Sequence, residues 1–168
     1  MKIPILARNL ISQGKLREAS TLLDQELSKS KNDDDLWYLR GVVSLKLKNY
    51  ESAYECFERA LSIKPRAQYY KIIGMAHLEM FEVGYAAEAF GNALKLNPKD
   101  AEANVYVGIC LVLLDDPKAK DYLEKAYLLD KKKTGEMLKS FYANFISKDP
   151  SVSERVKKEL EKKIGGIK

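Results

Sequence analysis

The chain has 168 residues, of which 46% are hydrophobic and 32% charged, with 9 glycines and 5 prolines. This composition excludes collagen-like and low-complexity sequences, and the length suffices for a buried core without disulfides or a metal. The formal net charge of +5 is a modest surplus that permits an acidic partner but does not require one. The surplus lies in the C-terminal part, because residues 1–130 carry 18 basic and 19 acidic side chains, whereas residues 131–168 carry 11 basic and 5 acidic ones.

Apolar segments are too short to predict a membrane span. The longest, from Val105 to Leu114, has ten residues, about half of the roughly 20 that a bilayer requires. Arg8 interrupts the first apolar run before a signal-peptide core of ~7–15 residues is complete. Cys56 and Cys110 lie far apart in apolar contexts, so we expect two buried, reduced thiols and no metal site. We therefore expect a cytoplasmic protein without a cofactor.

A period of 33 or 34 residues organises the chain up to about residue 133. The residues in register are Ala19 with Leu23, Ala53 with Phe57, Ala86 with Phe90 and Ala119 with Leu123, and in a second series Ala7, Gly41, Gly74 and Gly108. This period predicts four copies of one helix pair, at about residues 1–33, 34–66, 67–100 and 101–133.

The helices of the second and fourth copies can be placed from capping residues and prolines. In the second copy, the first helix is expected from about Asp34 to Leu47, with Asp33 as a capping candidate, and Pro65 closes the copy. In the fourth copy, Asp116 followed by proline predicts the start of the second helix. The recurring small residues predict close contact between the two helices of a copy, because a lone helical glycine costs ~1 kcal/mol relative to alanine.

The second copy carries a motif that spans both of its helices. It reads Trp37-x-x-Arg40-Gly41-x-x-Ser44, then Ala53-x-x-x-Phe57-x-x-Ala60 and Pro65. This motif resembles the tetratricopeptide repeat, with Arg40 and Ser44 as departures. The resemblance is good in the third copy and partial in the first and fourth. It implies an all-α fold, an α-α superhelix of four helix-pair repeats with a concave inner face, and a non-catalytic role as an adaptor or scaffold for other proteins.

Residues 134–168 are predicted to form capping helices that continue the same domain. From Thr134 to Ser147 the apolar residues form a broad face that must cover the last repeat. A final helix is expected to begin at a capping box of Ser151 and Glu154 and to end at Gly165. Its apolar residues recur every four positions, at Val152, Val156, Leu160 and Ile164.

Residues that could carry catalysis are sparse. His77 is the only histidine and lies on the same helical side as Tyr70, which predicts a packing role. The two cysteines have no other histidine as a partner, and the acidic clusters at Asp33 and Asp115 fall at predicted helix starts, where they serve as caps. We assign no catalytic residue and do not expect an enzyme.

The concave face follows from helical phase. Residues one position after Trp37 and Gly41 are rotated by ~100° onto a neighbouring face. With their counterparts in other copies they give the candidate partner-binding groove: Arg8, Tyr38, Val42, Lys71, Met75, Val105 and Ile109. Such a largely apolar surface is typical of interaction sites, so we expect it to bind a peptide or helix of another protein.

Two alternatives to a foreign partner stay open. In the first, the C-terminal aromatic helix or a neighbouring subunit fills the groove, and the second subunit makes the protein a homo-oligomer. In the second, the basic C-terminal residues bind nucleic acid or an anionic surface, through Lys131 to Lys133 and the later lysines. A solvated basic face is favoured over this second alternative, because Lys131 to Lys133 follow a predicted helix end and the later lysines alternate with glutamates.

Overall fold

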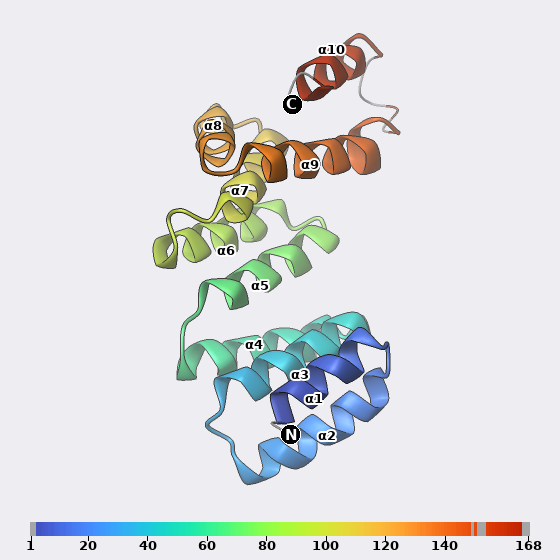
Figure 1. The fold of residues 1–168 in the computed structure, drawn as a ribbon, viewed down its shortest axis with the longest axis vertical. Helices are drawn as coiled ribbons and strands as arrows, with labels where there is room; N and C mark the ends of the chain where they lie inside the picture. The colour runs from blue at the N-terminus through green and yellow to red at the C-terminus, as the bar shows by residue number, and fades with distance from the viewer. Residues whose placement is uncertain (1–2, 149, 151–153, 166–168) are drawn as a thin grey trace. The chain divides into compact units, whose positions relative to one another are not determined.

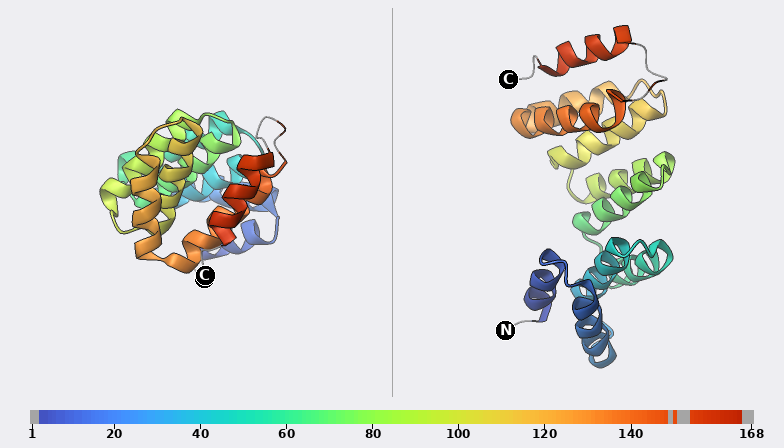
Figure 2. Two further views of the ribbon diagram at one scale, coloured as in Figure 1. Left: turned by 90° about the horizontal axis from the view of Figure 1, so that it is seen from above. Right: turned by 90° about the vertical axis from the view of Figure 1, so that its right-hand side faces the viewer.

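The computed structural model describes residues 3–148, 150 and 154–165, and every regular element in these ranges is a helix. The chain forms two compact units, one within residues 1–82 and the other within residues 83–168 (Figures 1 and 2). The predicted all-α class is confirmed. The predicted capping box at Ser151 lies outside the described residues, as do the side chains of Val156, Leu160 and Ile164.

The first unit is built from paired helices. Their bounds are α1 Ile3–Ser12, α2 Leu16–Lys29, α3 Asp34–Lys46, α4 Tyr50–Ile63 and α5 Ala67–Glu79. Helix α1 packs on α2, and α3 packs on α4, which gives the helix pairs predicted for the first two copies (Figure 1). Helix α3 also contacts α1 and α2, and α5 contacts α3 and α4 in the same way.

Two clusters of buried side chains hold the first unit together. The first consists of Ala7, Ala19, Leu23, Leu27, Leu36, Leu39 and Val43, and the second of Leu45, Ala53, Phe57 and Ala76. Phe57 is completely buried beside Gly41. Each cluster draws on both helices of a copy and on a helix of the neighbouring copy, so burial of apolar area stabilises the stacking of copies as well as each pair.

The helix starts are set by short polar side chains. The Asp33 carboxylate accepts hydrogen bonds from the backbone N–H groups of Asp35 at 3.0 Å and Leu36 at 3.1 Å, which confirms its predicted capping role. Asn49, Asp100 and Asp130 cap later helices in the same manner. These caps satisfy backbone donors that the first turn of a helix leaves free.

The turn between the two helices of each copy contains one left-handed residue. These residues are Gly14, Lys48, Phe81 and Asp115, with φ angles of 73°, 61°, 59° and 54°. Their spacing of 34, 33 and 34 residues repeats the period of the sequence. Only the first copy uses glycine, the residue that adopts this conformation without steric cost.

The second unit contains α6 Val83–Leu96, α7 Ala101–Leu113, α8 Ala119–Leu129, α9 Lys131–Phe141, the π-helix η1 Tyr142–Ile146, and α10 Glu154–Gly165. Helix α7 packs on α6 and α8, and α9 packs on both α7 and α8. Helix α10 packs on α9 and η1. The rings of Phe90 and Tyr106 stack at 4.6 Å between α6 and α7.

Two predicted boundaries are displaced in this unit. The capping region was expected from residue 134, but α9 begins at Lys131, because the Asp130 carboxylate accepts a hydrogen bond from the Lys133 N–H at 2.9 Å. Lys131 to Lys133 therefore form the first turn of α9. Asp116 caps the turn before α8 by accepting from the Lys118 N–H at 2.9 Å, and the helix itself starts at Ala119.

Candidate functional site

Arg8 of α1 and Tyr38 of α3 lie together on the surface of the first unit. The Arg8 guanidinium carbon is 6.0 Å from the centre of the Tyr38 ring, within reach of a cation–π interaction. Arg8 also forms an ion pair with the Asp35 carboxylate, one turn before Tyr38 on the same helix. The carboxylate thus holds the guanidinium over the ring.

The inner side of Tyr38 is supported by other rings. It stacks on Tyr69 of α5 with the ring centres 4.5 Å apart, and its centre is 6.1 Å from that of Phe57. Burial raises the pKa of the Tyr38 phenol, against the opposing positive charges of Arg8 and Lys71. Val42, one turn further along α3, is half-buried against the second core cluster. Tyr38 and Val42 are therefore partly packing residues.

Tyr69 is held in turn by a polar group that the repeat motif did not predict. Its hydroxyl donates to Oδ2 of Asp34 at 2.6 Å, and Nε of Arg66 donates to the same oxygen at 2.6 Å. Burial alone would raise the pKa of Asp34, but the hydrogen bonds from Tyr69 and Arg66 and the Arg66 charge together lower it. The only sequence signal for this cluster is the 35-residue spacing of Asp34 and Tyr69, close to one repeat.

Lys71 and Met75 of α5 are the other residues that the sequence predicts for this surface. They are four residues apart on one helix, so their side chains lie on the same side. Lys71 is half-buried, and Met75 is 39% exposed. We call Arg8, Tyr38, Val42, Lys71 and Met75 the first-unit face.

Val105 and Ile109 do not form an open surface, which corrects the prediction for these two residues. Their side chains are 0% and 4% exposed and pack with Ala126 against helix α9. The α9 residues that contact this cluster are Met137, Leu138 and Phe141. Helical phase placed Val105 and Ile109 correctly on α7, but the next helix of the stack covers that side. Helix α9 therefore covers these two residues.

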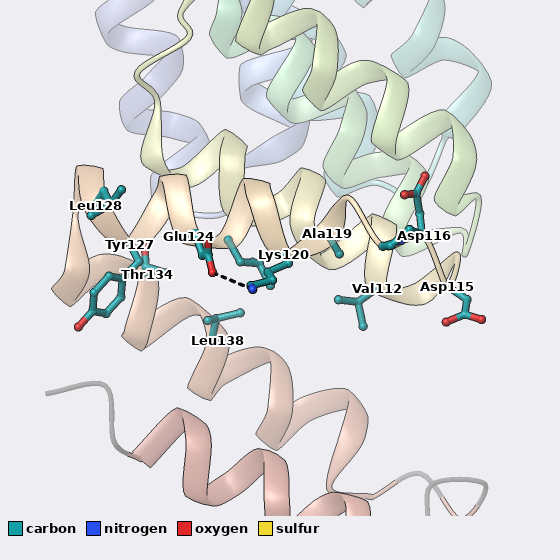
Figure 3. A pocket seen from close by; sticks show the side chains of 12 residues that line it. Val112, Asp115, Asp116, Ala119, Lys120, Glu124, Tyr127, Leu128, Thr134 and Leu138 are labelled. Carbon is teal, nitrogen blue, oxygen red and sulfur yellow. Dashed lines mark ion pairs between the residues drawn. The ribbon is translucent and has the colours of Figure 1, made fainter.

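A cavity of about 890 Å³ opens in the second unit between the end of α7, helix α8 and helix α9 (Figure 3). Its wall is mostly apolar, and two of its side chains, Val112 and Leu128, are 51% and 85% exposed. Asp115 and Asp116 stand at one end, and Lys120 pairs with Glu124 at 3.6 Å along the rim. The cavity could not be predicted from helical phase, because it lies beside the second helix of the fourth copy rather than on the predicted inner face.

The remaining candidate groups have packing partners. Nδ1 of His77 is 3.1 Å from the Tyr54 hydroxyl and 2.7 Å from a Glu82 carboxylate oxygen, and the His77 ring stacks on Tyr54 at 4.7 Å. Cys56 and Cys110 are buried free thiols, as predicted. Within the described ranges no cluster of acidic, histidine or cysteine side chains could hold a metal ion. None of the helices described is long and apolar enough to cross a membrane.

Comparison with known proteins identifies the class. The tetratricopeptide repeat model matches residues 35–66, and no curated protein matches the sequence. One similar structure, MamA from Desulfovibrio magneticus RS-1, is 26% identical over 77% of this chain and 75% of its own, with a TM-score of 0.67. Together with the repeated helix pairs, these findings support a tetratricopeptide-repeat protein.

Two further solved structures match almost the whole chain. YrrB, described as a TPR protein with an unusual peptide-binding site, is 22% identical over 99% of this chain and 84% of its own, with a TM-score of 0.71. PilF of Pseudomonas aeruginosa is 17% identical over 98% of this chain and 82% of its own, also with a TM-score of 0.71. At these identities the likeness extends to the superhelical fold alone.

Proposed function

We propose that this chain is a non-catalytic interaction module that binds a peptide or helix of another protein on the first-unit face. The observation that carries the proposal is the Arg8 guanidinium held over the Tyr38 ring by Asp35, and the exposed Met75 is a further apolar residue that the sequence assigns to this face. Aromatic and arginine side chains dominate the binding energy of protein interfaces, and methionine adapts to irregular apolar partners. Because Tyr38 is already stacked on Tyr69, little rotamer freedom is lost on binding.

The chemistry of the face indicates the partner. An apolar or aromatic side chain of the partner would contact Tyr38 and the exposed Met75, and Arg8 and Lys71 would favour an acidic residue beside it, although Arg8 is already paired with Asp35. The repeat fold and the peptide-binding site described for YrrB support the same class of function.

We do not propose nucleic-acid binding through the basic C-terminal residues. Lys133 pairs with Glu102 at 3.2 Å, and Lys157 pairs with Glu154 at 2.9 Å. The Lys131 ammonium lies 5.6 Å from the centre of the Tyr127 ring. These contacts favour a solvated basic face over a phosphate-binding surface.

A displayed peptide library tests the proposal with the full chain as bait. We expect the selected peptides to carry apolar anchors with acidic neighbours, and to bind the double variant Tyr38→Ala, Met75→Ala at least tenfold more weakly. Leu47→Ala removes an apolar side chain that is 51% exposed but lies in the turn after α3, so it is the matched control and should bind normally. Circular dichroism melting must show that each variant is folded. Equal binding by the double variant would refute the proposal.

A further inference from the structure

The cavity in the second unit has the position of a missing helix. Helix α9 packs on α7 and α8 as α3 packs on α1 and α2, so it takes the place of the first helix of a fifth copy. Helices α3, α7 and α9 start at residues 34, 101 and 131. Counted from these starts, the eighth residues are Gly41, Gly108 and Leu138.

That eighth residue faces the second helix of its own copy. A Cβ added to Gly41 would meet Phe57 of α4 at 2.5 Å, and one added to Gly108 would meet Leu123 of α8 at 2.5 Å. Leu138, the eighth residue of α9, packs at one edge on the cluster of Val105 and Ile109 and also lines the cavity (Figure 3). The cavity therefore occupies the place that the second helix fills in the preceding copies.

The lining residues show that this place is suited to an occupant. Leu128 is 85% exposed and Tyr127 is 36% exposed, although both lie on the wall of the cavity. Thr134, the fourth residue of α9, is 1% exposed, and its Oγ1 makes no hydrogen bond with any described residue. A helix in the cavity would cover the Leu128 and Tyr127 side chains and remove apolar area from water.

The chain's own last helix lies elsewhere. Helix α10 packs on α9 and η1, and the Tyr142 hydroxyl donates to the Lys157 carbonyl oxygen at 3.0 Å. In Figure 3, α9 lies between α10 and the cavity-lining helix α8. Helix α9 and η1 together run from Lys131 to Ile146 and span 16 residues, whereas α3 and α7 span 13 each. The end of η1 therefore lies almost one helical turn further from the helix start than the ends of α3 and α7, where the chain turns back into the second helix of the pair.

The sequence of α10 matches what the cavity requires. Its apolar residues recur every four positions, as Ala53, Phe57 and Leu61 do in the second helix of the second copy. It has 12 residues, between the 11 of α8 and the 14 of α4. Residues 154–165 carry five basic and three acidic side chains, whereas the cavity rim presents Asp115 and Asp116 beside the paired Lys120 and Glu124. Opposite net charges favour this pairing.

We propose that α10 of a second copy of this chain docks in the cavity as the second helix of a fifth repeat. Because each protein molecule carries both this cavity and an α10, reciprocal exchange between two molecules closes a two-fold symmetric dimer. The proposal is independent of the first-unit face, since every residue involved belongs to the second unit.

Sedimentation equilibrium of the full chain tests the proposal. We expect a monomer–dimer equilibrium as the concentration rises from micromolar to sub-millimolar. Leu128→Asp, at a side chain too exposed to matter for folding, should weaken the dimer at least tenfold. Leu96→Asp, at a 49% exposed position of the same unit outside the cavity, should leave it unchanged. A synthetic peptide of residues 150–168 should dissociate the dimer. A persistent monomer, or a dimer indifferent to Leu128→Asp or to the peptide, overturns the proposal.

Disulfide crosslinking distinguishes a second copy from the chain's own helix. Two singly substituted proteins, Leu128→Cys and Glu161→Cys, are mixed and oxidised, so that a bond between the two positions can join only different copies. We expect a mixed crosslinked dimer. The native Cys56 and Cys110 should not interfere because both are buried. If no mixed dimer forms, while a chain with both substitutions closes internally as a monomer, α10 of the same chain is the occupant and the proposal is wrong.

Discussion

A methyl group added to Gly41 would lie 2.5 Å from Cε1 of Phe57, closer than real side-chain contacts permit. Phe57 is completely buried and cannot move aside without disturbing Ala53 and Leu45 of the same cluster. We therefore expect Gly41→Ala to lower the free energy of unfolding by about 1–3 kcal/mol, as overpacking of a core does. Urea denaturation followed by circular dichroism measures this change.

Gly91→Ala is the matched control for that substitution. Gly91 lies inside α6, and a Cβ added there meets no atom within 4 Å. Since alanine is the better helix former, Gly91→Ala should stabilise the protein by about 0.5–1 kcal/mol. If both substitutions stabilised the protein, the ring of Phe57 would not be what requires glycine at position 41.

The left-handed turn residues give a second pair of predictions. Phe81 is 78% exposed and has a φ of 59°, so Phe81→Gly should remove backbone strain without loss of packing and raise the free energy of unfolding by about 1 kcal/mol. Gly14 has a φ of 73° and open space around it, so Gly14→Ala should be destabilising by a similar amount. Thermal melts of the two variants should shift in opposite directions, and a shift in the same direction contradicts the strain argument.

Helical phase predicted from the sequence which residues share a side of a helix, but not what covers that side. The period located the helix pairs. Gly41 lies against Phe57, as the recurring small residues predicted, and Asp33 caps α3, as its position before the helix predicted. Val105 and Ile109 are at the expected positions of α7 and are nevertheless buried. A repeat motif specifies the contacts within the copies that carry it, whereas α9 lies beyond the recognisable motif, so the motif did not predict the packing of Met137, Leu138 and Phe141 on α7.

The helix start at Lys131 shows a second limit of sequence reasoning. Three consecutive lysines at the positive end of a helix dipole are locally unfavourable, so the pattern favoured assigning them to the end of the preceding helix. In the structure the Asp130 cap, the ion pair of Lys133 with Glu102 and the contact of Lys131 with Tyr127 offset this cost. The ion pair joins residues 31 positions apart and is a tertiary contact, which residue spacing alone does not predict.

Cys110 should be inert in the folded protein. Burial raises the pKa of its thiol to about 12, and the side chain is 0% exposed. Because the thiolate is the reactive form, iodoacetamide at neutral pH should leave Cys110 unmodified, while the same reagent in denaturant modifies it fully. Mass spectrometry of tryptic peptides measures both states. Rapid modification of Cys110 in the native protein would show that α7 opens locally.

The Asp34 carboxylate should make stability depend on pH. Its pKa in the folded protein is lowered, burial being outweighed by the hydrogen bonds from Tyr69 and Arg66. Because the pKa is lower in the folded protein, the stabilisation that the Asp34 charge provides is complete above the ordinary pKa of 3.8. This stabilisation is lost as the pH falls through the pKa of the folded protein. Asp34→Asn should therefore cost about 1 kcal/mol or more at neutral pH, and the difference from wild type should shrink in acid. Asp24→Asn is the control, because that carboxylate pairs with Arg40 but is 55% exposed and should give a smaller effect. Urea denaturation of both variants across the acid range measures the two differences, and a cost for Asp34→Asn that stays constant in acid would refute the role given to its charge.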